Sequence, residues 1–144
     1  MNRSVSLAAL ACWLAVAAAG CQTGAARRAG AVVDPCAERL HDLSGRLLLY
    51  YSLHGALPAA LEDLESADPT PLPPLVCPVS GKPYVYNRDG LPVRGRPGRA
   101  VLYDAAPTHS GMRWAVLTNP PSEGQALTAR VLLLPERPVF SAGK

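Results

Sequence analysis

Residues 34–55 read DPCAERLHDLSGRLLLYYSLHG, and this stretch predicts an amphipathic helix whose two ends are both encoded. Asp34 can accept hydrogen bonds from the first free amides, and Pro35 suits the first helical position, where its missing N–H has no partner to lose. Gly55 can adopt the left-handed conformation that ends many helices. One apolar stripe must be covered by another part of the fold. Its members recur at three- and four-residue steps: Leu40, Leu43, Leu47, Tyr50 and Tyr51.

After this helix, the sequence predicts short elements joined by turns. A shorter helix is expected over residues 57–64, and the prolines of residues 67–74 predict an extended surface crossing, since proline fits neither helix interiors nor central strands. One long N-terminal helix followed by strands favours an α+β fold, in which the amphipathic helix packs on a small antiparallel sheet of three to four strands. Strands are expected at 84–86, 100–103, 114–117 and 129–134, with turns at Asp89-Gly90 and 120–124.

The first twenty residues have the layout of a secretory signal peptide. Arg3 and the amino terminus supply positive charge, an uncharged apolar run extends from Val5 to Ala19, and small residues follow. The run is shorter than the roughly 20 apolar residues of a membrane-spanning helix. We therefore expect residues 1–20 to be removed.

Cys21 gives this signal a more specific interpretation. The sequence Ala18-Ala19-Gly20-Cys21 resembles the bacterial lipobox, with Ala18 where leucine is usual, and in such signals the cysteine is lipidated with palmitate-type chains. Each buried methylene contributes about 0.8 kcal/mol, so several chains on one residue anchor a protein stably. Gln22 resembles the class sorted to the outer membrane, on its periplasmic side or at the surface. The alternative is an ordinary signal peptide cleaved nearby.

Length and charge constrain the part of the chain beyond the signal. The 144 residues suffice for one domain, which we expect over residues 34–136, after a flexible tether over 21–33 and before a tail over 137–144. The net charge of +3 is too small to indicate a nucleic-acid partner. Arg39, Asp42 and Arg46 fall outside the apolar stripe of the helix and are expected to face solvent.

Two cysteines remain after the signal and the lipid site are set aside. Cys12 lies in the signal and Cys21 is assigned to lipid, which leaves Cys36 and Cys77. In an oxidising compartment a disulfide between them is the default, and it would stabilise the fold by roughly 4 kcal/mol on the chain-entropy model.

Zinc is the alternative for these cysteines. Residues 77–82, CPVSGK, resemble half of a zinc knuckle, but Ser80 stands where the second thiolate belongs. The histidines His41, His54 and His109 are scattered along the chain. We therefore predict neither a metal site nor a cofactor.

Two loops offer polar candidates for function. Arg94, Arg96 and Arg99 lie among prolines and glycines, as in an anion-binding loop or a solvated hairpin tip, and with Asp104 and His109 they are candidates for an interaction loop. His109, Asp104 and Ser110 could also form a hydrolytic or small-ligand site. Three residues of one short loop seldom achieve the geometry of a Ser-His-Asp set, and no GxSxG or HExxH motif is present. We therefore expect the protein not to be an enzyme.

The order of the motifs resembles a known family. A helix ending in Leu-Tyr-Tyr and a glycine, then LPxxLxxL, then CPxSGKPYxY, is similar to the soluble, type IV pilin-like domain of type II secretion pseudopilins, and especially to pilin-like proteins of planctomycete-type bacteria. A late VLYD…HSG stretch fits the same pattern. The residues that carry the resemblance are Leu49, Tyr50, Tyr51, Gly55, Leu57, Pro58, Leu61, Leu64, Cys77, Pro78, Ser80, Gly81, Lys82, Pro83, Tyr84, Tyr86, Val101, Leu102, Tyr103, Asp104, His109, Ser110 and Gly111.

The chain also departs from that family. A pilin is cleaved before a long apolar helix that drives filament assembly, whereas the apolar run here precedes the cleavage site, and Ala25 stands at the fifth mature position where pilins carry glutamate. The resemblance thus implies an envelope protein, held in the membrane by lipid on Cys21, that binds other envelope or secretion-system proteins. A passive surface lipoprotein is the remaining alternative.

Overall fold

The computed structural model describes residues 33–119 and 126–140. The predictions for the signal peptide, Cys21, the tether and the turn at 120–124 lie outside these residues. The described elements belong to one compact unit that begins at Val33. They are α1 (Pro35–His54), the 3-10 helix η1 (Leu61–Ala67), β1 (Val85–Pro92), β2 (Arg99–Tyr103), β3 (Met112–Thr118), β4 (Ala129–Pro135) and the short α2 (Glu136–Val139).

Helix α1 begins and ends where the sequence predicts. The Asp34 side chain accepts a hydrogen bond from the Cys36 amide at 2.9 Å. Gly55, at φ 69°, donates its N–H to the Tyr51 carbonyl at 2.8 Å, which closes the helix. Of the predicted stripe, the three leucines are buried and the two tyrosines are partly buried.

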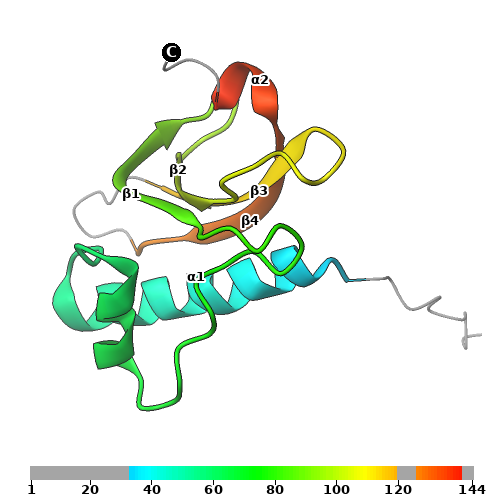
Figure 1. Cartoon of the computed structure of the whole chain (residues 1–144). Coiled ribbons are helices and arrows are strands. Elements are labelled where there is room, and N and C mark those ends of the chain that lie inside the picture. Colours follow the sequence, from blue (N-terminus) through cyan, green and yellow to red (C-terminus); the bar gives the residue numbers. More distant parts are fainter. Residues whose placement is uncertain (1–32, 120–125, 141–144) are drawn as a thin grey trace, which may run out of the picture. The chain divides into compact units, whose positions relative to one another are not determined.

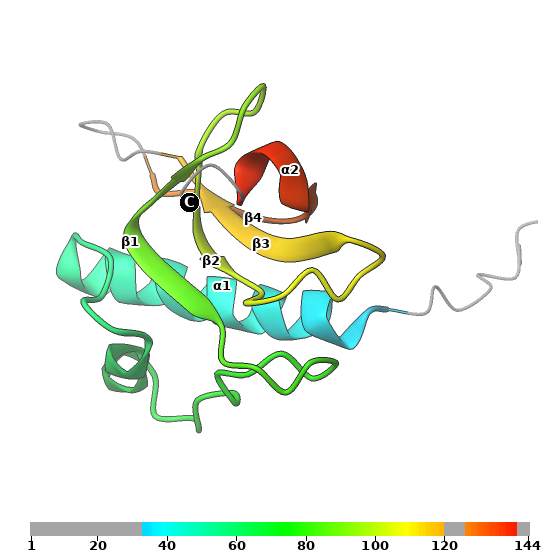
Figure 2. The ribbon, with the colours of Figure 1, turned by 45° about the horizontal axis from the view of Figure 1, so that its top comes forward.

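The sheet is a four-stranded antiparallel meander in the order β1-β2-β3-β4, which confirms the predicted α+β class. Helix α1 lies along one face of this sheet, mainly against β3 and β4 (Figures 1 and 2). The sheet therefore buries the apolar stripe of the helix, as expected for an element that cannot leave such a stripe in water.

Apolar side chains gather on both faces of the sheet. The larger core, between the helix and the sheet, includes Cys36, Leu40, Leu43, Leu47, Leu61, Leu64, Cys77, Tyr84, Val101, Leu102 and Val116. The smaller one, on the far face, is built on Val93, Ala100, Ala115, Leu117 and Leu134, with Phe140 packed against it. An irregularity in the β2–β3 register between Ala100 and Leu102 accompanies this division, because it lets Val101 and Leu102 both join the larger core.

Two local predictions were wrong. The second helix begins at Leu61 rather than at Leu57, and it is a 3-10 helix. Asp89 and Gly90 do not form the hairpin turn. They lie inside β1, where the register with β2 shifts between Tyr86 and Leu91, and the chain turns between Pro92 and Arg99 instead. A glycine at positive φ marks a bulge here, because the same residue that suits a turn also suits an extra residue in a strand.

Gly90 gives a test of this bulge. A Cβ at Gly90 would lie 2.7 Å from the Arg99 Cβ, and the residue has φ +64°. Gly95 has a similar φ of +72°, but a Cβ there meets nothing within 4 Å. We expect Gly95→Ala to lower the free energy of unfolding by about 1 kcal/mol from backbone strain alone. Gly90→Ala should lower it by about 2–4 kcal/mol, since overpacking is added. Urea denaturation of both variants would measure this, and equal losses would contradict the close approach.

The sequence predicted that Arg46 would face solvent, but in the structure its side chain is largely buried. Its guanidinium forms an ion pair with Asp68 at 3.1 Å, with the Arg46 side chain only 12% exposed. It also donates to the carbonyls of Asp68, Thr70 and Pro71, and to the Thr70 hydroxyl. Residues 68–71 are therefore fastened to α1 although they form no helix or strand.

The folded chain continues beyond Glu136, where the sequence placed the start of a tail. Glu136 begins α2 and receives two hydrogen bonds from the Arg113 guanidinium, at 2.5 and 2.8 Å, which lower the pKa of its carboxyl group. The Arg113 guanidinium also lies 5.1 Å from the centroid of the Phe140 ring, which is tilted against the Tyr103 ring with the two centroids 4.9 Å apart. These contacts hold residues 136–140 over the far face of the sheet. Within the described residues, no helix has the length and apolar character needed to cross a membrane.

Candidate functional site

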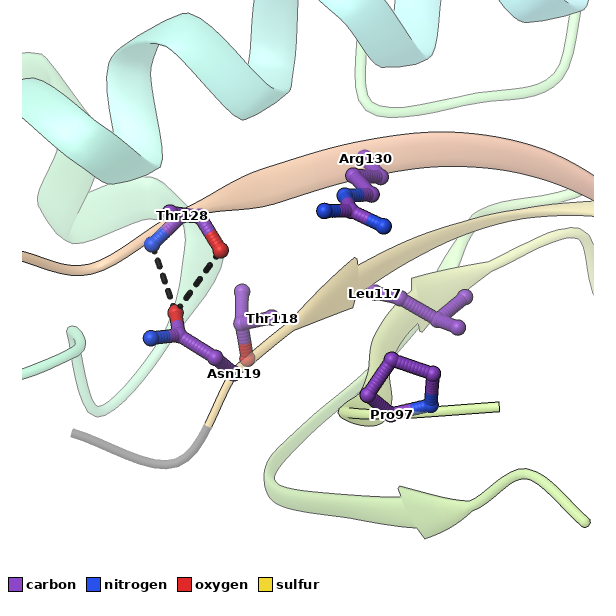
Figure 3. Close-up of a pocket in the computed structure, with 6 residues that line it drawn as sticks. All are labelled: Pro97, Leu117, Thr118, Asn119, Thr128 and Arg130. Atoms are coloured by element: carbon purple, nitrogen blue, oxygen red, sulfur yellow. Dashed lines mark hydrogen bonds between the residues drawn. The ribbon is translucent and has the colours of Figure 1, made fainter. Parts of the chain in front are cut away.

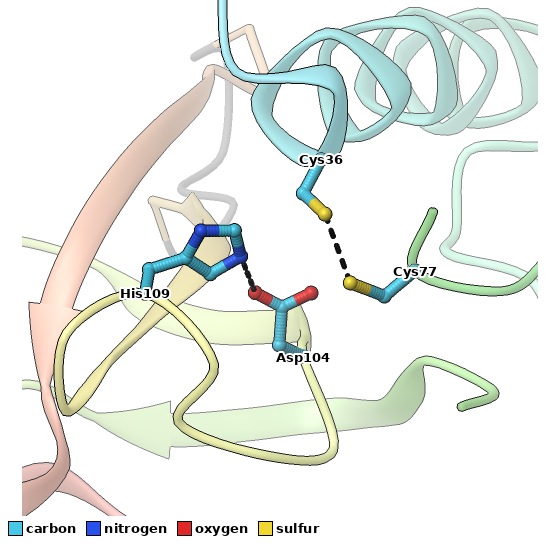
Figure 4. Close-up of side chains that lie close together, drawn as sticks. All are labelled: Cys36, Cys77, Asp104 and His109. Atoms are coloured by element: carbon cyan, nitrogen blue, oxygen red, sulfur yellow. Dashed lines mark hydrogen bonds and ion pairs between the residues drawn. The ribbon is translucent and has the colours of Figure 1, made fainter. Parts of the chain in front are cut away.

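Four side chains from distant parts of the sequence meet at one end of the molecule: Cys36, Cys77, Asp104 and His109 (Figure 4). One potential ligand atom from each lies within 4.8 Å of the others. Three of the four residues are buried and His109 is nearly so. We call this set the Cys-Asp-His cluster.

A different element supplies each member of the cluster. Cys36 lies in the first turn of α1, and Asp104 directly follows β2. Cys77 begins a tight loop before β1, in which its N–H donates to the Lys82 carbonyl and its carbonyl accepts from the Gly81 N–H. His109 begins a second tight turn, before β3, in which it exchanges backbone hydrogen bonds with Met112. The cluster thus lies where these four segments come together.

The two sulfur atoms of the cluster lie 2.9 Å apart. A disulfide bond measures about 2.05 Å, so the pair would need to approach by about 0.9 Å to form one. Both thiols are fully buried. Burial and the neighbouring Cys77 thiol raise the pKa of Cys36 to about 12. The contact fits the predicted pairing of these cysteines, and the disulfide itself stays a prediction.

Asp104 is buried without full compensation for its charge. Its Oδ2 accepts a hydrogen bond from the Trp114 amide at 2.9 Å, but its Oδ1 has no partner. Burial raises the pKa of this carboxyl group, and the Trp114 amide, the Cys77 thiol and the nearby His109 offset only part of that effect. An unpaired carboxylate oxygen in a buried position is costly unless a proton or a cation joins it.

His109 is held between two carboxylates. Its Nδ1 lies 2.9 Å from Asp34 Oδ2, and its Nε2 lies 3.3 Å from Asp104 Oδ2 without forming a hydrogen bond. The tight turn that presents it has positive φ at both central residues, 54° at Ser110 and 80° at Gly111, as in a type I′ turn. The turn aims the Nε2 edge of the imidazole into the cluster.

Asp34 joins the helix start to this turn. One of its oxygens caps α1, while the other lies against His109 Nδ1 and accepts a hydrogen bond from the Trp114 indole at 3.0 Å. Burial alone would raise its pKa, but the hydrogen bonds from Trp114 and Cys36 and the proximity of His109 hold the pKa below its usual value. The sequence indicated only the cap. Nothing in the spacing of residues 34, 109 and 114 signals that they meet.

The predicted interaction loop does not form as one surface. Arg94, Arg96 and Arg99 precede or begin β2 and are exposed, whereas Asp104 follows that strand and is buried. The two groups therefore lie at opposite ends of β2. The turn that carries these arginines is exposed, as in the alternative of a solvated hairpin tip. Arg99 donates to the carbonyls of Asp89 and Gly90 within its own hairpin.

Ser110 is not placed as a nucleophile. Both nitrogen atoms of His109 face carboxylates, those of Asp34 and Asp104, so neither is directed at the Ser110 hydroxyl. The arrangement that a hydrolytic Ser-His-Asp set requires, with the imidazole between hydroxyl and carboxylate, is therefore not formed by these three residues.

A separate pocket of about 60 Å³ lies at the other end of β3 and β4 (Figure 3). It is large enough to hold water. At its rim the Asn119 side chain accepts from the Thr128 amide and hydroxyl, at 2.6 and 3.0 Å, and so joins the two strands. We interpret this pocket as part of the contact between the strands rather than as a binding site. Six residues line it: Pro97, Leu117, Thr118, Asn119, Thr128 and Arg130.

Comparison of this chain with protein-family models, with curated proteins and with solved structures finds no match.

Proposed function

We propose that this chain is a lipid-anchored protein of the cell envelope, in the outer membrane on its periplasmic side or surface, whose pilin-like domain binds other proteins in or near a secretion or pilus-like system. The observation that carries the proposal is the order of elements: one long helix, a loop-rich crossing and then an antiparallel meander covered by that helix. The motifs that resemble pseudopilins follow the same order.

The anchor is inferred from the sequence alone. Helix α1 starts at Pro35, thirteen residues after Gln22, so the segment between Cys21 and the domain is long enough to act as a tether. Lipid on Cys21 would hold the domain at the membrane in place of the apolar helix that a pilin uses. The domain would then be available to bind partners without polymerising through such a helix.

A non-enzymatic role fits the Cys-Asp-His cluster. Asp104 is fully buried and the His109 side chain is 10% exposed, so these polar side chains offer little surface to a substrate. Catalytic acids and bases have to reach the reacting groups within hydrogen-bonding distance. The structural contacts of both residues, to Trp114 and to Asp34, account for their positions in the fold.

The proposal is tested by crosslinking the anchored protein in intact envelopes. A photo-reactive residue would replace Leu53, which is 61% exposed at the end of α1, and in a second variant Arg94, which is exposed on the β1–β2 turn. We expect a discrete adduct of higher mass from at least one variant. Monomer alone at both positions would contradict a protein-binding role.

The same envelopes test the anchor. Cys21→Ala should abolish labelling by a radioactive fatty acid, release the protein from the outer-membrane fraction and remove the adduct. Cys12→Ala is the matched control, because Cys12 lies within the predicted signal, and it should change none of these results. Fatty-acid labelling that persists in Cys21→Ala would refute the lipid assignment.

A further inference from the structure

We propose that the Cys-Asp-His cluster, in the form with two free thiols, is a binding site for Zn²⁺. The ligands are Cys36 Sγ, Cys77 Sγ, a carboxylate oxygen of Asp104 and His109 Nε2. Zinc in proteins is bound by four such groups, chosen from thiolate, imidazole and carboxylate, in a tetrahedral arrangement. This inference goes beyond the proposed envelope function and depends on neither the lipid nor a partner.

The unpartnered atoms of the cluster support a cation rather than further protein contacts. Among the described residues, only three buried side-chain atoms lack a hydrogen-bond partner, and two of them are Asp104 Oδ1 and His109 Nε2. The third is the Tyr84 hydroxyl, which lies on a ring in the larger core. A disulfide between the cysteines would leave Asp104 Oδ1 and His109 Nε2 unpaired. One metal ion would bind both of these residues together with both sulfurs.

Asp34 supplies the hydrogen-bond acceptor that a zinc-bound histidine usually has for its other ring nitrogen. A ligating imidazole usually donates its other N–H to a carboxylate, which fixes the tautomer and the ring orientation. His109 Nδ1 lies 2.9 Å from Asp34 Oδ2. With the proton on Nδ1, the lone pair of Nε2 points into the cluster. The Trp114 indole holds the same carboxylate oxygen from another side, at 3.0 Å. Asp34 is therefore a positioning residue for the site.

The loop that carries Cys77 also suits a metal thiolate. In this CPVSGK turn the Gly81 amide bonds back to the Cys77 carbonyl at 2.8 Å, and Gly81 has φ +65°. The Val79 amide of the same turn donates to the Cys36 sulfur. The turn thus supplies the Cys77 thiolate and contacts the Cys36 sulfur. A zinc knuckle would have a second cysteine at the position of Ser80, and here ligands from other segments take that role.

The geometry requires one small adjustment. Zinc–sulfur bonds of about 2.3 Å in a tetrahedron place two sulfurs about 3.8 Å apart. The present separation is 2.9 Å. The sulfurs would therefore move apart by about 0.9 Å on binding zinc, about as far as they would move together to form a disulfide. Zinc binding and disulfide formation use the same two sulfur atoms, so the disulfide form cannot bind the metal at this site.

The test uses the full chain in detergent, with C12S and C21S so that Cys36 and Cys77 are the only thiols. The metal-free protein, reduced with a phosphine, is titrated with Co²⁺ and then with Zn²⁺. We expect one Co²⁺ per chain, with the strong visible absorption and sulfur-to-cobalt charge-transfer bands of a tetrahedral thiolate site, displaced by one Zn²⁺. The same chain oxidised to the disulfide with diamide should show neither band. A reduced, folded chain without these bands would overturn the proposal.

Matched variants assign the ligands. His109→Ala should weaken Zn²⁺ binding at least about 100-fold, whereas His41→Ala, an exposed histidine on α1, should leave it unchanged. Asp34→Asn can still cap the helix, so we expect it to weaken binding about 10- to 100-fold while the tetrahedral cobalt spectrum persists. Unchanged zinc affinity in a folded His109→Ala chain would contradict the assignment. Should that variant fail to fold, Asp104→Asn, with Asp42→Asn as its control, would decide in the same way.

Discussion

Asp34→Ala is expected to lower the free energy of unfolding by about 3 kcal/mol. Loss of a helix cap contributes about 1 kcal/mol of this. The rest comes from His109 Nδ1 and the Trp114 indole, which both face the same Asp34 oxygen and would lose their acceptor in a partly buried site. Each buried donor left without a partner costs about 1–3 kcal/mol. Urea denaturation followed by circular dichroism would measure the change.

Asp42→Ala is the control for this prediction. Asp42 is an exposed carboxylate on the same helix, so its removal should change the stability by less than about 0.5 kcal/mol. The loss of stability in Asp34→Asn should fall between those in Asp34→Ala and Asp42→Ala. An amide oxygen still caps the helix, but it accepts hydrogen bonds less strongly than a carboxylate. A loss of only about 1 kcal/mol in Asp34→Ala would show that Asp34 acts as a cap alone.

Cys36→Ala is expected to have an effect of similar size in the oxidised protein. If Cys36 and Cys77 form a disulfide after export, the loop it closes is long, and its loss would cost about 4 kcal/mol on the chain-entropy model. Cys36 also fills a fully buried position in the larger core. We expect limited proteolysis to cut more readily both within the first turns of α1 and near β1, because the bridge would join these two segments.

A variant with both cysteines replaced separates the contribution of the disulfide bond from that of side-chain packing. Cys36→Ala with Cys77→Ala should cost little more than either single change, because each single change already breaks the bond. Adding a reductant to the wild-type protein should reproduce most of the loss. Unchanged protease resistance in Cys36→Ala would refute the coupling between the helix start and β1. Two free thiols in protein purified from envelopes without reductant would refute the disulfide.

The helix and the strands could be predicted because their signals are local. Asp34 and Gly55 define the ends of α1 by side-chain chemistry and backbone conformation, and the structure confirms both. The later strands follow from short apolar runs that lie between turn signals. The misplaced turn at Asp89-Gly90 shows the limit of such signals, since positive φ at glycine is needed in a bulge as well as in a turn.

The candidate site could not be predicted in the same way. Cys36, Cys77, Asp104 and His109 are brought together only by the packing of α1 on the sheet and by the two tight turns beside it. Ser80, at the position of a second thiolate, argued against a zinc knuckle, but sequence spacing says nothing about ligands from other segments. Arg46 shows the same limit, because its partners in residues 68–71 belong to a loop without a periodic pattern.

The position of Asp34 has a mechanical consequence. Any force transmitted along the chain from residues before Val33 enters the described fold at Asp34 and the first turn of α1. There the chain is joined side by side to three other segments, through His109, Trp114 and Cys77, by contacts of 2.9 to 3.0 Å. A pull along the helix axis would have to break these contacts together rather than one after another. Several side-chain contacts thus hold the fold at the point where a membrane tether would transmit force to it.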